Sequence, residues 1–379
     1  KLILNLRDIF PQSAIDIGIL KSASAVRVFR RMERDAYLRA DSITVNSEKA
    51  RQFLIEKKRV PDDKISVVWN YVDPEAYDGP IKTDFRESCG LKNKFVFLFS
   101  GILGSAQGLR FLISVAQKVK QNENIVFLLV GDGPEKVQLR SLVEESILFN
   151  VVFKDFVSAE DYPSLLKSAN VCVLCVNSES KTSFVSGKFF DYLAAGKPVL
   201  GILNRGNDGF DLIREARCGM SVEAGDLGGS EKAVRAMCGM DRAELLAMGE
   251  NGKKYAREHF AKKMTVHESV ELHVATKEVE NIPLAEEKIA PPVEHVAESK
   301  VAVRPMEIEP VETSVLAIKE PRESVFKKIG SVINSIVREI GLSVTKIEGP
   351  IIATEKKIVE DVKISSGWIR NLVFSVSML

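Results

Sequence analysis

The sequence is poor in cysteine and histidine and has almost no net charge. Five cysteines in 379 residues are too few for a disulfide framework and fit a reducing cytosol. A formal net charge of +1 gives no reason to expect a nucleic-acid partner. No signal-peptide pattern is recognisable, and no apolar run is long enough to span a bilayer. These absences favour a cytoplasmic protein, and a hydrophobic content of 45% is ample for a buried core.

Two of the cysteines form a CxxC pattern that could suggest redox chemistry or zinc binding. Cys172 and Cys175 lie inside the apolar run VCVLCV, which predicts a buried strand. Side chains three apart in a strand point to opposite faces. We therefore expect two separate buried thiols rather than a redox or zinc site.

Strands and helices alternate along most of the chain, which predicts parallel α/β sheets. The chain opens on LILNL, an apolar run typical of a buried strand, so we expect it to begin inside a domain. The polar stretch 74–94 contains Gly79-Pro80 and predicts an interdomain linker. The expected segments are an incomplete Rossmann-like domain at 1–73, this linker at 74–94, a second Rossmann-like domain at 95–274, a disordered linker at 275–323 and a helical tail at 324–379.

The stretch GKFFDYLAAGKPVLG, residues 187–201, predicts a helix that Gly196 ends and a short buried strand. Lys188 and Asp191 are three residues apart, so they share a face at the start of this helix. A helix N-terminus beside a lysine suits a phosphate, and the carboxylate one turn later could accept hydrogen bonds from a ribose. The pair suggests a nucleotide site, although two solvated charges on an amphipathic helix give the same pattern.

Three polar loops with glycine follow predicted strands. The first, GILGSAQG at 101–108, opens a helix, and its backbone N–H groups can face an anion. It is neither a dinucleotide fingerprint nor a P-loop. The other two loops are 177–188 and 204–209. In an open parallel sheet, ligands bind at the carboxyl ends of the strands, so we expect a ligand site where these loops meet.

The composition changes after about residue 275. Frequent prolines among Glu, Lys, Val and Ala predict an extended or disordered linker. Apolar residues at helical spacing then predict amphipathic helices within 324–379. Their lysines and arginines suit peripheral contact with the inner face of a membrane. The acidic residues mixed among them favour docking on partner helices or self-association instead, and both readings stay open.

Six motifs follow one another between about residues 41 and 268: ADSITVNSE, DKISVVWNYVD, FLFSGILGSAQGL, VFLLVGDGPEKVQL, GKFFDYLAAGKPVLG and CGMSVEAGD. In this order they resemble the GT-B glycosyltransferases of group 1, the GT4 family, and most closely the branch that acts on cell-surface polysaccharide and lipopolysaccharide O-antigen. The segment LRDIFPQSAIDIG also looks like the end of that branch's acceptor-side domain.

The resemblance implies two Rossmann-like domains, the second binding a nucleoside-diphosphate sugar and the first a polysaccharide or lipid-linked glycan acceptor. It also implies retaining sugar transfer with no obligatory metal and no cofactor besides the sugar nucleotide. Lys188 matches the family's lysine that pairs with the diphosphate. Asp191 matches the second glutamate of the EX7E motif, which holds the ribose. The donor-binding residues implied are Gly101, Gly104, Gln107, Gly108, Lys188, Asp191, Asn207, Asp208 and Gly209.

The chain also departs from the family pattern. Ser183 stands where the first glutamate of EX7E would be, and Ile102 and Gln107 replace the loop's usual Arg and Lys. The four histidines all lie downstream of the donor motifs, so no catalytic residue can be assigned. Two alternatives stay open: a non-catalytic GT-B scaffold that binds a nucleotide or sugar, and a GT-B nucleotide-sugar 2-epimerase.

Overall fold

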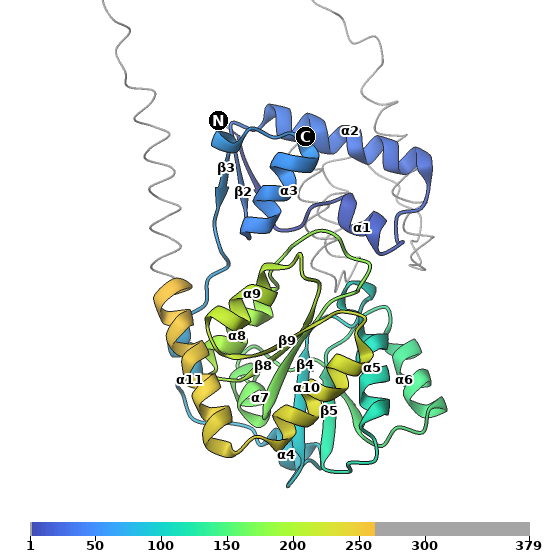
Figure 1. Cartoon of the computed structure of the whole chain (residues 1–379), viewed down its shortest axis with the longest axis vertical. Helices are drawn as coiled ribbons and strands as arrows, with labels where there is room; N and C mark the ends of the chain where they lie inside the picture. Colours follow the sequence, from blue (N-terminus) through green and yellow to red (C-terminus); the bar gives the residue numbers. More distant parts are fainter. Residues whose placement is uncertain (1, 262–379) are drawn as a thin grey trace, which may run out of the picture. The chain divides into compact units, whose positions relative to one another are not determined.

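The computed structural model describes residues 2–261, which form two parallel sheets with their helices (Figure 1). The predicted linker at 275–323 and the predicted tail helices at 324–379 lie outside the described residues, as do residues 262–274 of the predicted second domain. The α/β class and the two Rossmann-like parallel sheets are confirmed.

The first sheet has three parallel strands in the order β1-β2-β3. They span Ile3–Leu6, Ser42–Val45 and Ile65–Val67. The helices of this part are α1 (Gln12–Asp16), α2 (Ala23–Arg39), α3 (Glu48–Lys58) and the 3-10 turn η1 (Asp62–Lys64). The sequence did not predict the short helix α1.

Serine caps fix where the two longer helices of the first sheet begin. Ser22 accepts a hydrogen bond from the backbone N–H of Ala25 at the start of α2, and Ser47 does the same for Ala50 at the start of α3. Such side chains satisfy N–H groups that have no partner inside the helix. The cap at Ser47 matters for the site, because it directs the first turn of α3.

The second sheet has six parallel strands in the order β6-β5-β4-β7-β8-β9. The chain moves outward from β4 through β5 to β6 and then returns to the other side of β4, so the order reverses between β4 and β7. The strands are β4 (Phe95–Ser100), β5 (Ile125–Val130), β6 (Val151–Lys154), β7 (Val171–Cys175), β8 (Val199–Leu203) and β9 (Gly219–Glu223).

Helices cover both faces of this sheet (Figure 1). One core contains buried residues of α5 (Leu109–Lys118), α6 (Lys136–Glu145) and α10 (Leu227–Gly239). The other contains buried residues of α7 (Tyr162–Ser168), α8 (Gly187–Ala194), α9 (Asp208–Glu215) and the end of α11 (Arg242–His259). The central strands β4, β5, β7 and β8 are buried along their whole length, as parallel strands covered on both faces must be.

The CxxC pair follows the predicted geometry. Cys172 belongs to one core and Cys175 to the other, so the two thiols lie on opposite faces of β7. Burial raises the pKa of each thiol to about 12. Both cysteines are inert core residues, as expected from the sequence.

The segment between the sheets is partly folded. It contains the 3-10 turn η2 (Pro74–Tyr77) and the short helix α4 (Phe85–Ser88). Tyr77, Phe85 and Leu91 are buried in the same core as α8. Within residues 2–261, no helix is both long and apolar enough to cross a membrane.

Candidate nucleotide site

The candidate site lies at the carboxyl ends of β4, β7 and β8, where the strand order of the second sheet reverses. The loop after β4 contains four predicted residues, and its 3-10 turn η3 spans Ser105–Gln107. Gly101 has φ +135°, and a Cβ there would lie 3.1 Å from Nζ of Lys188. Gly104 precedes η3, and its carbonyl accepts a hydrogen bond from N–H of Gln107. Gly108 has φ +60°, and a Cβ there would lie 2.5 Å from the carbonyl oxygen of Val176. Both positive-φ positions favour glycine for conformation, and Gly108 needs it for space as well, because its Cβ would meet backbone atoms.

Lys188 projects from the first turn of α8 toward this loop. Its Nζ donates a hydrogen bond to Oε1 of Gln107 at 2.7 Å and lies 4.1 Å from the centre of the Phe99 ring. Burial lowers the pKa of Lys188 to about 7. No carboxylate within residues 2–261 forms an ion pair with it. A half-buried ammonium beside a glycine loop, with an amide as its partner, is suited to an incoming anion.

Gln107 occupies the loop position at which the GT4 family pattern has lysine. The structure brings Lys188 to this position from another element, so a cation is present there although the loop itself has none. Only the tertiary structure reveals this pairing, because the two residues are 81 apart in the sequence.

Asp191 lies one turn further along α8 and faces a different partner. The hydroxyl of Tyr77 in η2 donates a hydrogen bond to Oδ1 of Asp191 at 2.7 Å. Burial raises the pKa of Asp191, and the bond from Tyr77 partly opposes that shift. Lys188 and Asp191 therefore lie one turn apart on α8, and their hydrogen-bond partners come from different segments.

Three hydroxyls that the sequence did not single out meet at the end of β4. Oγ of Ser100 lies 2.9 Å from the hydroxyl of Tyr162 and 3.1 Å from the hydroxyl of Tyr192. Backbone N–H of Ser100 also donates to the Tyr192 hydroxyl at 3.3 Å. The negative charge of Asp191 contributes to raising the pKa of Tyr162, after the larger effect of burial. The only sequence signal was the position of Tyr192 directly after Asp191.

The third set of predicted donor-binding residues, Asn207, Asp208 and Gly209 at the start of α9, forms hydrogen bonds within the protein. The carboxylate of Asp208 is 7% exposed and accepts hydrogen bonds from Oγ of Ser183 at 2.8 Å and from backbone N–H of Lys49 at 3.2 Å. Oδ1 of Asn207 accepts the N–H of Gly209 at 2.8 Å and so caps α9. Asp208 thus places a carboxylate beside Ser183, which stands where the EX7E motif would have its first glutamate.

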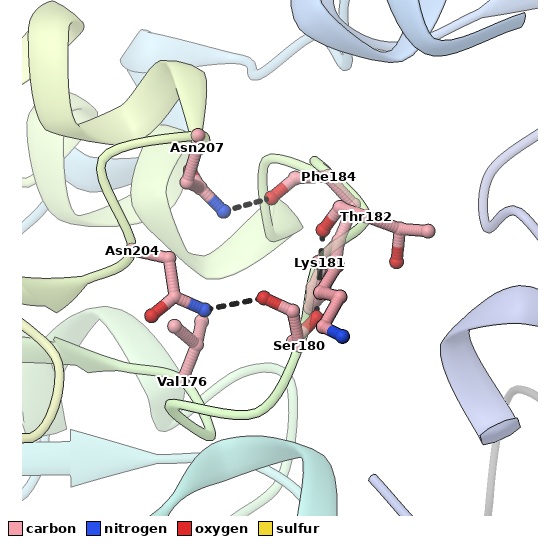
Figure 2. A pocket seen from close by; sticks show the side chains of 8 residues that line it. Val176, Ser180, Lys181, Thr182, Phe184, Asn204 and Asn207 are labelled. Carbon is pink, nitrogen blue, oxygen red and sulfur yellow. Dashed lines mark hydrogen bonds between the residues drawn. The ribbon is translucent and has the colours of Figure 1, made fainter. Parts of the chain in front are cut away.

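A cavity of about 110 Å³ lies between the loops after β7 and β8. Figure 2 shows that two asparagines reach from the loop after β8 to the other loop. Nδ2 of Asn207 donates to the carbonyl of Phe184 at 2.8 Å, and Nδ2 of Asn204 donates to the carbonyl of Ser180 at 2.6 Å. These bonds fix the polar wall of the cavity next to Thr182 and Lys181.

Comparison with known proteins finds glycosyltransferase domains in both sheets. Residues 94–240 match the family described as "Glycosyl transferases group 1", and residues 20–76 match "Glycosyltransferase Family 4". The chain is 24% identical over 249 residues to "Probable glycosyltransferase WbjE" of Pseudomonas aeruginosa, covering 65% of this chain and 62% of that protein. It is 23% identical over 200 residues to "Putative colanic acid biosynthesis glycosyl transferase WcaI" of Escherichia coli K12, covering 51% and 49%.

Solved structures share the fold. HepE from Anabaena, in complex with UDP and glucose, superposes with a TM-score of 0.60 at 18% identity, covering 72% of this chain and 71% of HepE. WaaG, a glycosyltransferase involved in lipopolysaccharide biosynthesis, gives 0.57 at 17% identity, covering 69% and 73%. The chain spans about three fifths of the length of WbjE and about half that of WcaI.

Proposed function

The chain belongs to the group 1 glycosyltransferases of the GT-B fold, and we propose that it transfers a sugar from a nucleoside-diphosphate sugar to a glycan acceptor. The observation that carries this proposal is the position of Lys188. A half-buried lysine with no acidic partner in the described chain contacts a glycine loop at the switch point of a parallel sheet. Such a site favours a ligand with concentrated negative charge, and a diphosphate fits it.

The chemistry follows from the leaving group. When the glycosidic bond to the nucleotide breaks, negative charge develops on the diphosphate. A cation and backbone N–H groups fixed in advance around it lower the barrier. Lys188 is the residue that we propose for this role, and the loop around Gly101 lies against it. Gly104, Gln107 and Gly108 complete the loop, whereas Asp191 is proposed at the ribose. Asn207, Asp208 and Gly209 are proposed near the sugar.

The finer features are proposals as well. We propose retaining transfer, with no obligatory metal and no cofactor besides the sugar nucleotide. For the acceptor we propose a polysaccharide or lipid-linked glycan, since the relatives include proteins named for colanic acid and lipopolysaccharide biosynthesis. We place the reaction in the cytoplasm, at the inner face of the membrane. Residues 324–379 are the candidate for that contact or for partner helices.

One observation favours a second function. Ser183 lacks the carboxylate that many relatives carry, and Ile102 and Gln107 leave the loop without charge. A scaffold that binds a nucleotide or sugar without turnover would tolerate both changes.

Isothermal titration of the full chain with UDP, GDP, ADP and CMP tests the donor site. Saturable heat with one diphosphate, lost in Lys188→Met and kept in the exposed control Lys92→Met, is the expected result. Sugar transfer by the wild type, abolished in Lys188→Met with the fold intact, distinguishes the enzyme from the scaffold. A folded protein that binds none of these nucleotides would contradict the proposed donor site.

A further inference from the structure

The hydroxyls at the end of β4 form a chain whose proton positions can be worked out. Tyr192 is fully buried and Ser100 is 3% exposed, whereas Tyr162 is half-buried. A buried hydroxyl needs an acceptor for its proton, and an unsatisfied one is unfavourable. Each of the three groups has one proton to donate.

Only one arrangement satisfies both buried groups with partners among residues 2–261. The hydroxyl of Tyr192 already accepts from backbone N–H of Ser100, and the acceptor within its reach is Oγ of Ser100. Oγ of Ser100 must then donate to the oxygen of Tyr162. If Tyr162 donated to Ser100 instead, either the proton of Tyr192 or that of Ser100 would have no acceptor. The proton of Tyr162 is therefore left for a group outside this chain.

Asp191, whose charge acts on Tyr162, also has one carboxylate oxygen left for a ligand. Tyr77 occupies Oδ1 of Asp191, and Oδ2 has no hydrogen-bond partner in the described part of the chain. Asp191 and Tyr162 are both half-buried, and the charge of the carboxylate acts on the phenol. The protein thus offers a donor at Tyr162 and an acceptor at Asp191, which lies one helical turn from Lys188 on α8. A ligand hydroxyl, which both donates and accepts, matches this combination.

We infer that Tyr162 is a specificity-determining residue, donating its proton to a ribose hydroxyl that Asp191 also binds, so that the site selects ribonucleotides over 2′-deoxyribonucleotides. The inference rests on the proposed function. A 2′-deoxyribonucleotide should bind more weakly than the ribonucleotide, because without the ligand hydroxyl the buried polar groups of the site stay unpaired.

The test compares ribose and deoxyribose forms of the ligand. UDP, GDP, ADP and CMP, each beside its 2′-deoxy analogue, are titrated into the full-length wild type, Tyr162→Phe and the control Tyr71→Phe. Tyr71 is half-exposed, and its substitution removes the same hydroxyl elsewhere. The wild type should prefer the ribonucleotide by about tenfold or more. Tyr162→Phe should reduce that preference to about twofold, mainly by weakening the ribonucleotide, and Tyr71→Phe should leave it unchanged.

The outcomes separate the two ideas. Ribonucleotide binding with the same preference in Tyr162→Phe as in the wild type would overturn the role of Tyr162 and leave the proposed donor site standing. Absence of binding by every nucleotide, from a folded protein, would overturn both.

Discussion

Proton uptake by Lys188 should make nucleotide binding depend steeply on pH. Burial lowers the pKa of this lysine to about 7 in the free protein. A bound diphosphate favours the charged form and raises the pKa again, toward the ordinary value for lysine. Above pH 7 the free protein is mostly neutral at Lys188, so binding has to take up a proton.

The magnitude follows from linkage. If Lys188 is protonated in the complex, the affinity should fall by roughly fiftyfold between pH 7 and pH 9, because about half of the free lysine is charged at pH 7 and only about one hundredth at pH 9. At pH 8 about nine tenths of the free lysine is neutral, so binding should absorb about 0.9 proton per site. The sign is fixed, because only the protonated lysine pairs with the anion.

Titration calorimetry measures both quantities. The bound diphosphate is titrated at pH 7, 8 and 9, and at pH 8 in two buffers that differ in ionisation enthalpy, HEPES and Tris. The difference in heat between the buffers gives the number of protons taken up. Lys188→Met should bind weakly at every pH and show little buffer dependence. An affinity that stays constant from pH 7 to 9 in the wild type, with equal heats in both buffers, would refute the reasoning.

Three further predictions concern groups around the site. Tyr77→Phe removes a bond that lowers the pKa of Asp191, so on acidification from pH 7 ribonucleotide affinity should begin to fall at a higher pH than in the wild type; coincident pH profiles would contradict the role of Tyr77. Gly108→Ala should lower the free energy of unfolding by at least about 1–2 kcal/mol in urea melts, because its φ is +60° and its Cβ would meet a carbonyl. The control Gly79→Ala, with nothing within 4 Å of its Cβ, should stay within about 0.5 kcal/mol, and equal losses would contradict the steric argument. Asp208→Ala should lower the free energy of unfolding by roughly 1–3 kcal/mol, because buried donors lose their acceptor. Removing a partly exposed carboxylate from an ion pair costs about 1 kcal/mol or less, and a loss no larger than that would contradict the role of Asp208 as a buried acceptor.

The sequence by itself determined the secondary structure and the edge at which the site lies. The apolar run VCVLCV predicted the buried strand β7, because strands buried on both faces leave continuous apolar runs. GKFFDYLAAGKPVLG predicted α8 and β8, and glycine-bearing loops after strands predicted the carboxyl edge. The short helix α1 was missed, since five residues carry too little periodicity to be recognised.

The tertiary structure decided which side chains meet at that edge. Hydrogen bonds join Lys188 to Gln107, Asp191 to Tyr77 and Ser183 to Asp208, which are 81, 114 and 25 residues apart in the sequence. Each pairing depends on strand order and on how far a side chain reaches, and local periodicity encodes neither. The proton order from Tyr192 to Tyr162 depends further on which hydroxyls are buried. The sequence therefore predicted the strands, helices and loops that surround the site, and tertiary packing determined which of their side chains form hydrogen bonds.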